Sequence, residues 1–95
     1  MEIALDDFDS TISYIAKEDL HAAQGVAQRI WRSAQSLVDN PKIGRVGRVS
    51  GVREKVVTEL PYLLIYRIKN NDIEIIRLLH DRQSWLDLET KPTNL

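Results

Sequence analysis

The stretch that decides the fold is Tyr62-Leu-Leu-Ile-Tyr-Arg-Ile68, then Lys69-Asn-Asn-Asp72, then Ile73-Glu-Ile-Ile-Arg-Leu-Leu79. The first segment is apolar on both faces, as a central strand is, and the last is equally rich in β-branched residues. Between them, Asn70-Asn71-Asp72 tolerates the positive φ angles that a tight hairpin turn requires. The stretch therefore predicts two antiparallel strands joined by a short turn.

Working outward, Leu60-Pro61 predicts a turn, because proline has no N–H to donate to a strand ladder. Arg53–Thr58 before it is predicted as a third strand. Residues 41–52 hold three glycines and three basic residues, which predicts a mobile basic loop. Beyond the strands, His80-Asp81-Arg82 leaves the sheet, Gln83–Leu88 is expected to form a short helical turn, and the last residues are expected to fray.

The N-terminal half predicts two helices. Apolar residues recur at helical spacing in both segments, and Trp31 flanks the second stripe and is expected in the core. Asp19 can cap the start of the second helix, and Asn40-Pro41 ends it. The two stripes are Leu5, Phe8, Ile12 and Ile15 in the first helix, and Ala23, Ala27, Ile30, Ala34 and Leu37 in the second.

These elements predict an α+β fold, with an N-terminal helical hairpin packed on one face of a C-terminal antiparallel β-meander of three strands. A chain of 95 residues has room for one domain. We divide it into a helical hairpin (1–40), a basic loop (41–52), a sheet with a C-terminal segment (53–88) and a tail (89–95).

Composition excludes several classes of function. The chain has no cysteine, which excludes disulfide scaffolds, thiolate nucleophiles and cysteine-bound zinc, and it has only two histidines, too few for a histidine-built metal site. It has no nucleotide-binding glycine loop, so we expect no metal and no cofactor. The acidic start does not resemble a signal peptide, and no apolar run is long enough to span a membrane. We therefore expect a cytoplasmic protein.

Charge is divided unevenly along the chain. Residues 1–40 hold three basic and seven acidic residues, a net charge of −4, whereas residues 41–85 hold nine basic and five acidic residues, a net charge of +4. One interpretation is a basic face on the C-terminal half that binds an acidic partner, and the other is a solvated surface of uneven charge.

Basic side chains on the predicted strands are the candidates for a binding site. Strand alternation places Arg53 and Lys55 on one face, and arginines on neighbouring strands suit phosphate or carboxylate groups. His80, with a pKa near neutrality, is a candidate proton-transfer group at the end of the last strand. The alternative is that His80 is a residue at the end of a strand with no role in proton transfer. His21 is expected to be a surface residue. The partner-binding candidates are Arg53, Lys55, Arg67, Arg77, Arg82 and Trp85.

The amino-acid sequence resembles the RelE/ParE family of toxins from bacterial toxin–antitoxin pairs. The resemblance rests on ordered segments over about residues 4–86, among them Gly51–Val57, Pro61–Ile68 and Ile73–Trp85. It implies a helical hairpin on an antiparallel sheet and a cognate antitoxin with an acidic amphipathic segment. A homodimer or a hetero-oligomer with the antitoxin is compatible with it.

The family has two branches, and the resemblance implies different functions for each. RelE-like toxins cut messenger RNA on the ribosome, and that pattern expects an arginine directly after the first tyrosine of the strand and a tyrosine near the end. This chain has Leu63 at the first position and no tyrosine after Tyr66. The sequence is therefore closer to the ParE branch, whose members inhibit DNA gyrase and lack the catalytic residues of RelE-like toxins.

Two alternatives stay open beside the ParE-like interpretation. In a RelE-like endoribonuclease, the resemblance would make His80 the acid or base, with Arg53, Lys55 and Arg82 holding the phosphate. The family also usually opens with a strand before the first helix, and here only Met1-Glu2-Ile3 precedes it. A short or absent first strand would leave a sheet edge unpaired, and would also fit an inactive truncated relative that only binds antitoxin.

Overall fold

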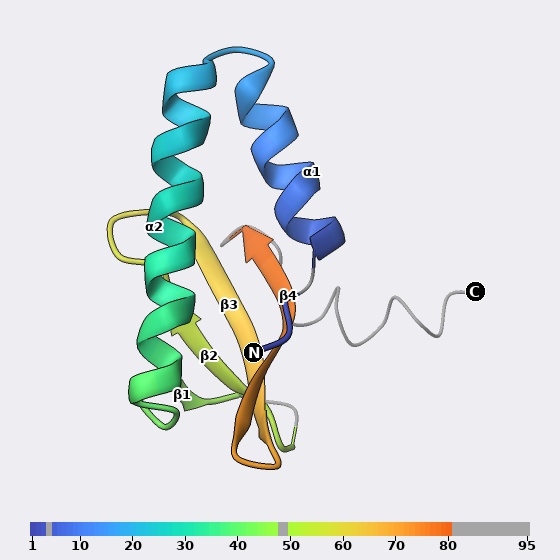
Figure 1. The fold of residues 1–95 in the computed structure, drawn as a ribbon, viewed down its shortest axis with the longest axis vertical. Helices are drawn as coiled ribbons and strands as arrows, with labels where there is room; N and C mark the ends of the chain where they lie inside the picture. Colours follow the sequence, from blue (N-terminus) through green and yellow to red (C-terminus); the bar gives the residue numbers. More distant parts are fainter. Residues whose placement is uncertain (4, 48–49, 81–95) are drawn as a thin grey trace, which may run out of the picture.

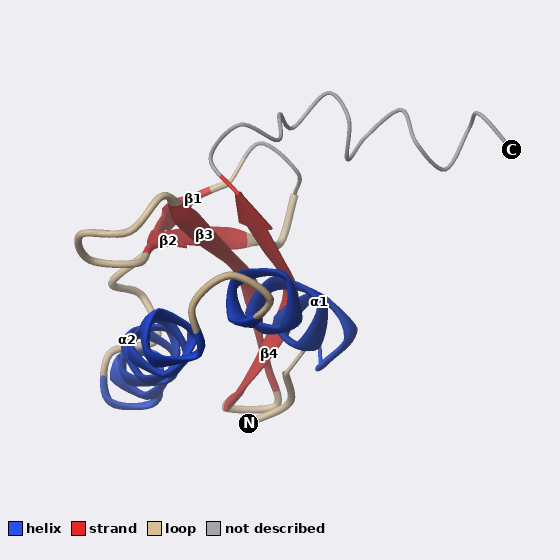
Figure 2. Cartoon of the chain, turned by 90° about the horizontal axis from the view of Figure 1, so that it is seen from above, coloured by secondary structure: helices blue, strands red, loops and turns tan. Residues whose placement is uncertain are grey.

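The protein has two helices followed by a four-stranded antiparallel sheet, in a computed structural model that describes residues 1–3, 5–47 and 50–80. Both helices lie on the same side of the sheet (Figures 1 and 2). This is the α+β arrangement that the sequence predicts. No helix in these described residues is long and apolar enough to cross a membrane.

The two helices form where the apolar stripes predict them. Helix α1 spans Leu5–Ala16 and helix α2 spans Leu20–Asp39. The carboxylate of Asp19 accepts a hydrogen bond from the Ala22 N–H over 3.0 Å, so it caps α2 as expected. Helix α1 has no fully buried residue, whereas α2 buries a stripe of four: Ala23, Ile30, Ala34 and Leu37. Helix α2 is therefore the main cover of the sheet.

The sheet has strand order β1-β2-β3-β4, in which every neighbouring pair is antiparallel. The strands are β1 (Arg45–Val46), β2 (Arg53–Val56), β3 (Tyr62–Lys69) and β4 (Asp72–His80). The turn between β3 and β4 contains Asn70 at φ 53° and Asn71 at φ 65°, the left-handed conformation predicted from their type. A register shift at Ile65/Tyr66 marks a bulge in the β3–β4 pair.

One expectation about the sheet needs correction, and another is not tested. Residues 41–52 are not all loop, because Arg45 and Val46 pair with Glu54 and Arg53 as a fourth strand. Such a short strand carries no periodicity that a sequence pattern could reveal. The expected helical turn at Gln83–Leu88 and the expected fraying of residues 89–95 lie outside the described residues.

The N-terminal segment covers part of the β4 edge that was expected to be unpaired. Glu2 bridges Glu74 in parallel, with its N–H bonded to the Ile73 carbonyl at 2.9 Å and its carbonyl bonded to the Ile75 N–H at 2.7 Å. The N-terminal ammonium group also lies 3.2 Å from an Asp72 carboxylate oxygen. The described segment before α1 thus contributes a single bridge to the sheet, where a short or absent first strand was predicted.

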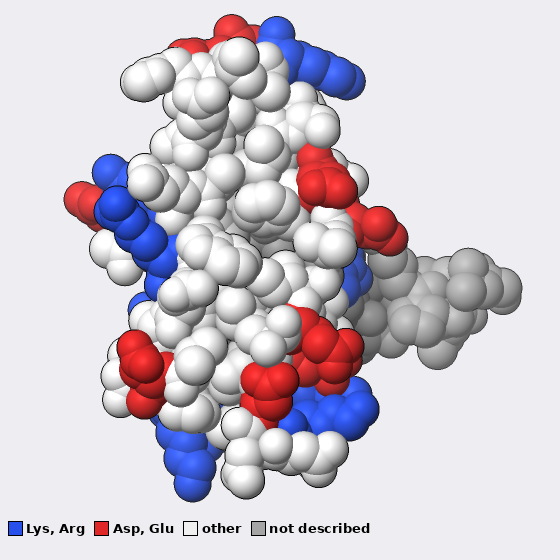
Figure 3. Space-filling view, viewed as in Figure 1, with Lys and Arg blue, Asp and Glu red and all other residues white. Residues whose placement is uncertain are grey.

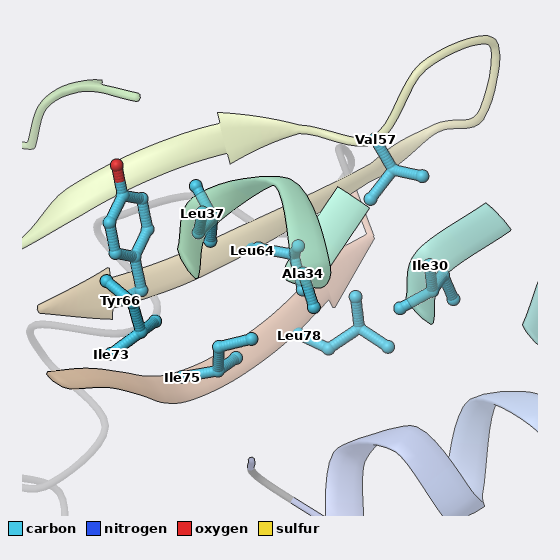
Figure 4. Close-up of a cluster of buried hydrophobic side chains, with 9 residues drawn as sticks. All are labelled: Ile30, Ala34, Leu37, Val57, Leu64, Tyr66, Ile73, Ile75 and Leu78. Carbon is cyan, nitrogen blue, oxygen red and sulfur yellow. The ribbon is translucent and has the colours of Figure 1, made fainter. Parts of the chain in front are cut away.

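The core lies between α2 and the sheet (Figure 4). Leu37 from α2 and Leu64 and Tyr66 from β3 are almost completely buried. The expectation that Trp31 lies in the core is wrong, because 46% of this residue remains exposed. It lies at a crevice between the helices and the sheet. The crevice is lined by Ile3, Phe8, Ile30, Trp31, Ala34, Leu64, Ile75 and Leu78.

Candidate partner-binding surface

Arg53 is used mainly to hold the chain between α2 and β1. Its guanidinium donates to the carbonyl oxygens of Gly44 at 2.9 Å and Lys42 at 3.5 Å. Below it, the buried hydroxyl of Tyr66 donates to the Pro41 carbonyl at 2.7 Å and accepts from the Gly44 N–H at 3.0 Å. These bonds fix residues 41–44 against the sheet, so Arg53 has a structural role whatever it binds.

Glu54, next to Arg53, is the buried carboxylate of the described structure. Its side chain is 3% exposed and accepts two hydrogen bonds from the Arg45 guanidinium, at 2.9 and 2.7 Å. A buried charge needs such compensation, so the pair ties β1 to β2. From the sequence, Arg45 was expected only as a basic residue of the 41–52 loop, and its pairing with Glu54 was not predicted.

Arg77 binds the start of α1 and not a surface cluster. Its Nε lies 2.7 Å from an oxygen of Asp7, and the same oxygen accepts the backbone N–H of Leu78 at 3.0 Å. Asp7 therefore occupies part of the outer edge of β4, beyond the bridge made by Glu2. This contact joins residues 70 positions apart, which no local pattern predicts.

The four described candidates do not share one face of the sheet. Arg53 and Lys55 lie opposite Tyr66 and Leu64, on the face covered by α2. Strand alternation places Arg67 on the other face, where it pairs with Glu74. The expected single basic face is therefore wrong for these residues, because the pleat separates them. Their binding of a partner stays a prediction.

Lys55 instead lies beside two arginines of α2 that sequence reasoning did not single out. Arg29, Arg32 and Lys55 line one open groove between α2 and β2. A signal for the helical part exists in the sequence, because Arg29, Arg32, Ser33 and Ser36 follow the spacing of one helix face. The proximity of Lys55 to that face depends on the packing of α2 on the sheet.

His80, at the end of β4, contacts an aromatic ring. It packs edge-to-face against Tyr62, with ring centroids 5.3 Å apart. Burial, followed by the charge of the nearby Tyr14 hydroxyl, raises the pKa of Tyr62 above its usual value of 10.0. The second histidine, His21, is exposed, as expected. Over the described residues, no group of three or more His, Cys, Asp or Glu could hold a metal ion.

Arg82 and Trp85, the remaining predicted contact residues, lie outside the described residues. The face of the sheet away from the helices carries an apolar patch in its described part, beside the Arg67–Glu74 pair. Ile65 and Leu79 are buried there, with Val52 and Leu63 packed against them. Leu63 stands at the position where the RNA-cutting pattern expects an arginine, so this face lacks that cation.

Comparisons with known proteins agree with this architecture. A family model described as ParE toxin of type II toxin-antitoxin system, parDE, matches residues 2–85. The chain is 39% identical over 82 residues to Putative toxin Y4kP of Sinorhizobium fredii, which covers 86% of this chain and 84% of that protein. It is 34% identical over 77 residues to Toxin RelE2 of Caulobacter vibrioides, covering 81% of this chain and 85% of that protein.

A solved structure shares the fold. The structure titled Chromosomal ParDE TA system from P. aeruginosa superposes with a TM-score of 0.73 at 25% identity, covering 84% of this chain and 89% of that one. The helical hairpin, the antiparallel sheet and the family match over nearly the whole chain point to one assignment. The protein is a member of the ParE toxin family, within the RelE/ParE group, and is the toxin of a ParDE-type toxin–antitoxin system.

Proposed function

We propose that this toxin acts on DNA gyrase and does so by binding, without covalent chemistry of its own. The observation that carries the proposal is the apolar sheet face formed by Leu63, Ile65 and Leu79. An RNA-cleaving site needs cations where the pentacoordinate phosphate forms, and the described part of this face holds none at the Leu63 position. The match of the ParE family model over residues 2–85 supports the same choice.

Family membership implies an antitoxin partner, and we propose that the antitoxin neutralises the toxin through an acidic amphipathic segment. The toxin's contacts with gyrase are expected to include Arg67, which is exposed on the face away from the helices, together with Arg82 and Trp85. Charge reversal at Arg53 or Arg77 would be a poor probe of either contact, because both side chains hold the fold together.

A gyrase assay tests the proposal. Purified toxin is added to gyrase with relaxed plasmid and ATP, and supercoiling and protease-released linear DNA are measured. We expect inhibition or trapped cleavage that the antitoxin reverses. Arg67→Gln should weaken inhibition several-fold, whereas the matched charge loss Lys17→Gln, on the exposed hairpin end, should leave it unchanged. If a toxin that is folded and binds antitoxin has no effect on gyrase in this assay, gyrase is rejected as the target.

A second candidate is ribosome-dependent cleavage of messenger RNA. Two observations favour it: the 34% identical relative named Toxin RelE2, and the placement of His80 against Tyr62 at the strand end. Primer extension on translated messenger RNA tests it, with His80→Gln as the variant. Cleavage that is lost in His80→Gln with an unchanged fold would establish the nuclease. If neither gyrase nor RNA responds, the chain is a relative that only binds antitoxin.

A further inference from the structure

An open groove of about 470 Å³ runs between α2 and the β2 end of the sheet. One wall is a polar stripe of α2, which lies next to the buried stripe of the same helix. The other wall comes from β2 and the turn that follows it. Lys and Arg side chains lie along this α2 edge of the molecule beside Asp and Glu side chains, whereas the surface over the two helices is largely uncharged (Figure 3). The lining residues are Arg29, Arg32, Ser33, Ser36, Ile43, Lys55, Thr58 and Glu59.

The groove carries more positive than negative charge. Three cations line it, and Glu59 is the one carboxylate among the described lining residues. Glu59 is already engaged, since its oxygen lies 2.8 Å from the Arg29 guanidinium. Arg32 makes no hydrogen bond or ion pair within the described chain, and the Lys55 ammonium group donates only to the Val56 carbonyl, at 3.2 Å. Two cationic groups are thus available to a ligand.

The fold sets the backbone positions from which these cations extend. Lys55 lies opposite Leu64 in the β2–β3 register, and Leu64 is buried under α2. Arg29 and Arg32 project from the same helix that supplies Ile30 and Ala34 to the core. A ligand therefore meets preset backbone positions, and the entropic cost that remains is the ordering of the Arg and Lys side chains.

The other lining groups suit a carboxylate carried on an amphipathic peptide. Thr58 offers a hydroxyl beside the cations, and Ile43, 53% exposed, offers an apolar surface next to them. A peptide that alternates acidic and apolar side chains would satisfy both features at once. We infer that the α2–β2 groove binds the acidic amphipathic segment of the antitoxin, with Arg32 and Lys55 pairing to its carboxylates.

Nucleic acid fits the groove less well than such a peptide. No aromatic ring lies among the described lining residues, so bases have no surface on which to stack. The whole chain has a net charge of −1 and an isoelectric point near 6.1, unlike a surface built to attract a polyanion. A local patch of positive charge on a slightly acidic protein matches a short acidic segment better.

A pair of double variants tests the inference, which rests on the antitoxin partnership and not on gyrase as target. Arg32→Gln with Lys55→Gln should weaken antitoxin binding about tenfold and reduce its salt dependence. The control, Lys17→Gln with Lys69→Gln, removes the same charge from exposed sites that do not line this groove and should leave affinity unchanged. Affinity is measured by calorimetry at several salt concentrations, after thermal unfolding confirms that each variant is folded.

A second variant is expected to strengthen binding. Glu59→Gln removes the carboxylate from the described lining and releases Arg29, so antitoxin affinity should rise several-fold. A gain of affinity cannot result from misfolding, and this keeps the test informative even if the double variant unfolds. Unchanged affinity in both the Arg32/Lys55 double variant and Glu59→Gln would overturn the inference.

The outcomes separate the inference from the proposed function. If the wild type binds antitoxin tightly and every groove variant has the same affinity, the groove is rejected as the binding site. The toxin–antitoxin partnership is then unaffected. Loss of gyrase inhibition with intact groove-dependent antitoxin binding rejects only the target. Titration of the wild-type chain with single-stranded RNA gives a third outcome, because binding that depends on Arg32 and Lys55 there, and not with antitoxin, would assign the groove to nucleic acid.

Discussion

Gly44 is the residue at which the structure leaves no room for a side chain. A Cβ atom built there would lie 2.6 Å from both the Glu54 carbonyl oxygen and the Tyr66 hydroxyl. The backbone of residue 44 comes this close because its N–H bonds the Tyr66 hydroxyl. Glycine is thus required by the approach of the loop to β2 and β3.

Gly44→Ala is expected to lower the free energy of unfolding by about 1–3 kcal/mol, because backbone atoms cannot yield to the added methyl group. Gly25→Ala is the matched control. Gly25 lies inside α2 with open space around it, so alanine there should stabilise the protein by about 0.5–1 kcal/mol. Urea unfolding measures both, and a Gly44→Ala protein as stable as wild type would contradict the close packing.

Asp72 makes stability depend on acid pH. The Ile73 N–H, and then the N-terminal ammonium group, lower the pKa of Asp72 below its usual 3.8. The stabilisation is therefore fully present above pH 3.8 and is lost as the pH falls through the lower folded-state pKa. Asp72→Asn should be less stable than wild type near neutral pH and equal to it in strong acid. Equal pH profiles of unfolding would show that Asp72 contributes nothing.

At the scale of elements, α1 is held to the sheet by polar contacts as well as by partly buried apolar side chains. It has no fully buried residue, and Asp7 in its first turn bonds both Arg77 and the Leu78 N–H. Elements with little buried apolar surface open at lower free energy than the rest of the fold. Asp7 is therefore expected to control how often α1 detaches from β4.

Asp7→Ala should destabilise the protein by about 1–3 kcal/mol, because it leaves the partly buried Arg77 and Leu78 N–H without their acceptor. Asp7→Asn should lie between, since its amide oxygen can still accept the Leu78 N–H. Asp9→Ala, at an exposed site of the same helix, is the control with little expected effect. Hydrogen exchange should also accelerate in α1 of Asp7→Ala, and equal effects of the two alanine variants would refute this role.

At the scale of the whole molecule, ion pairs join the N-terminal half of the chain to its C-terminal half. Three ion pairs of the described structure join residues 1–40 to the later residues: Met1–Asp72, Arg29–Glu59 and Arg77–Asp7. Of these, only Arg77–Asp7 joins an acidic residue of the N-terminal half to a basic residue of the C-terminal half, so these pairs leave most of the charge asymmetry unneutralised. Among the cations that line the described α2–β2 groove, Lys55 comes from the basic C-terminal half, whereas Arg29 and Arg32 come from α2.

Stability should therefore fall with added salt. The Arg29–Glu59 and Arg77–Asp7 pairs are partly exposed, so screening of these two is expected to remove on the order of 1 kcal/mol. Urea unfolding at low and moderate sodium chloride measures the change. The double variant Asp7→Asn with Glu59→Gln, which removes two of the pairs, should lose most of this dependence, and an unchanged salt response in it would assign the effect to other charges.

The sequence alone determined the kinds of element and much of their extent. Helix α2 follows from its apolar stripe and from the Asp19 cap, and the β3–β4 hairpin follows from Asn70 and Asn71. These features are readable because a helix cap and a tight turn depend on residues close together in the chain. The ordered wording of the strands also sufficed to place the chain in its family.

The tertiary structure decided which charges are available. The alternation of side chains along β2 could be predicted from the sequence. The pairing of Arg77 with Asp7 and of Arg53 with the Gly44 carbonyl could not. The groove formed by Arg32 and Lys55 likewise requires α2 to lie across β2. Sequence patterns report the face on which a side chain lies within its own element. Its partner depends on how two elements pack, and that packing is decided by the apolar core as a whole.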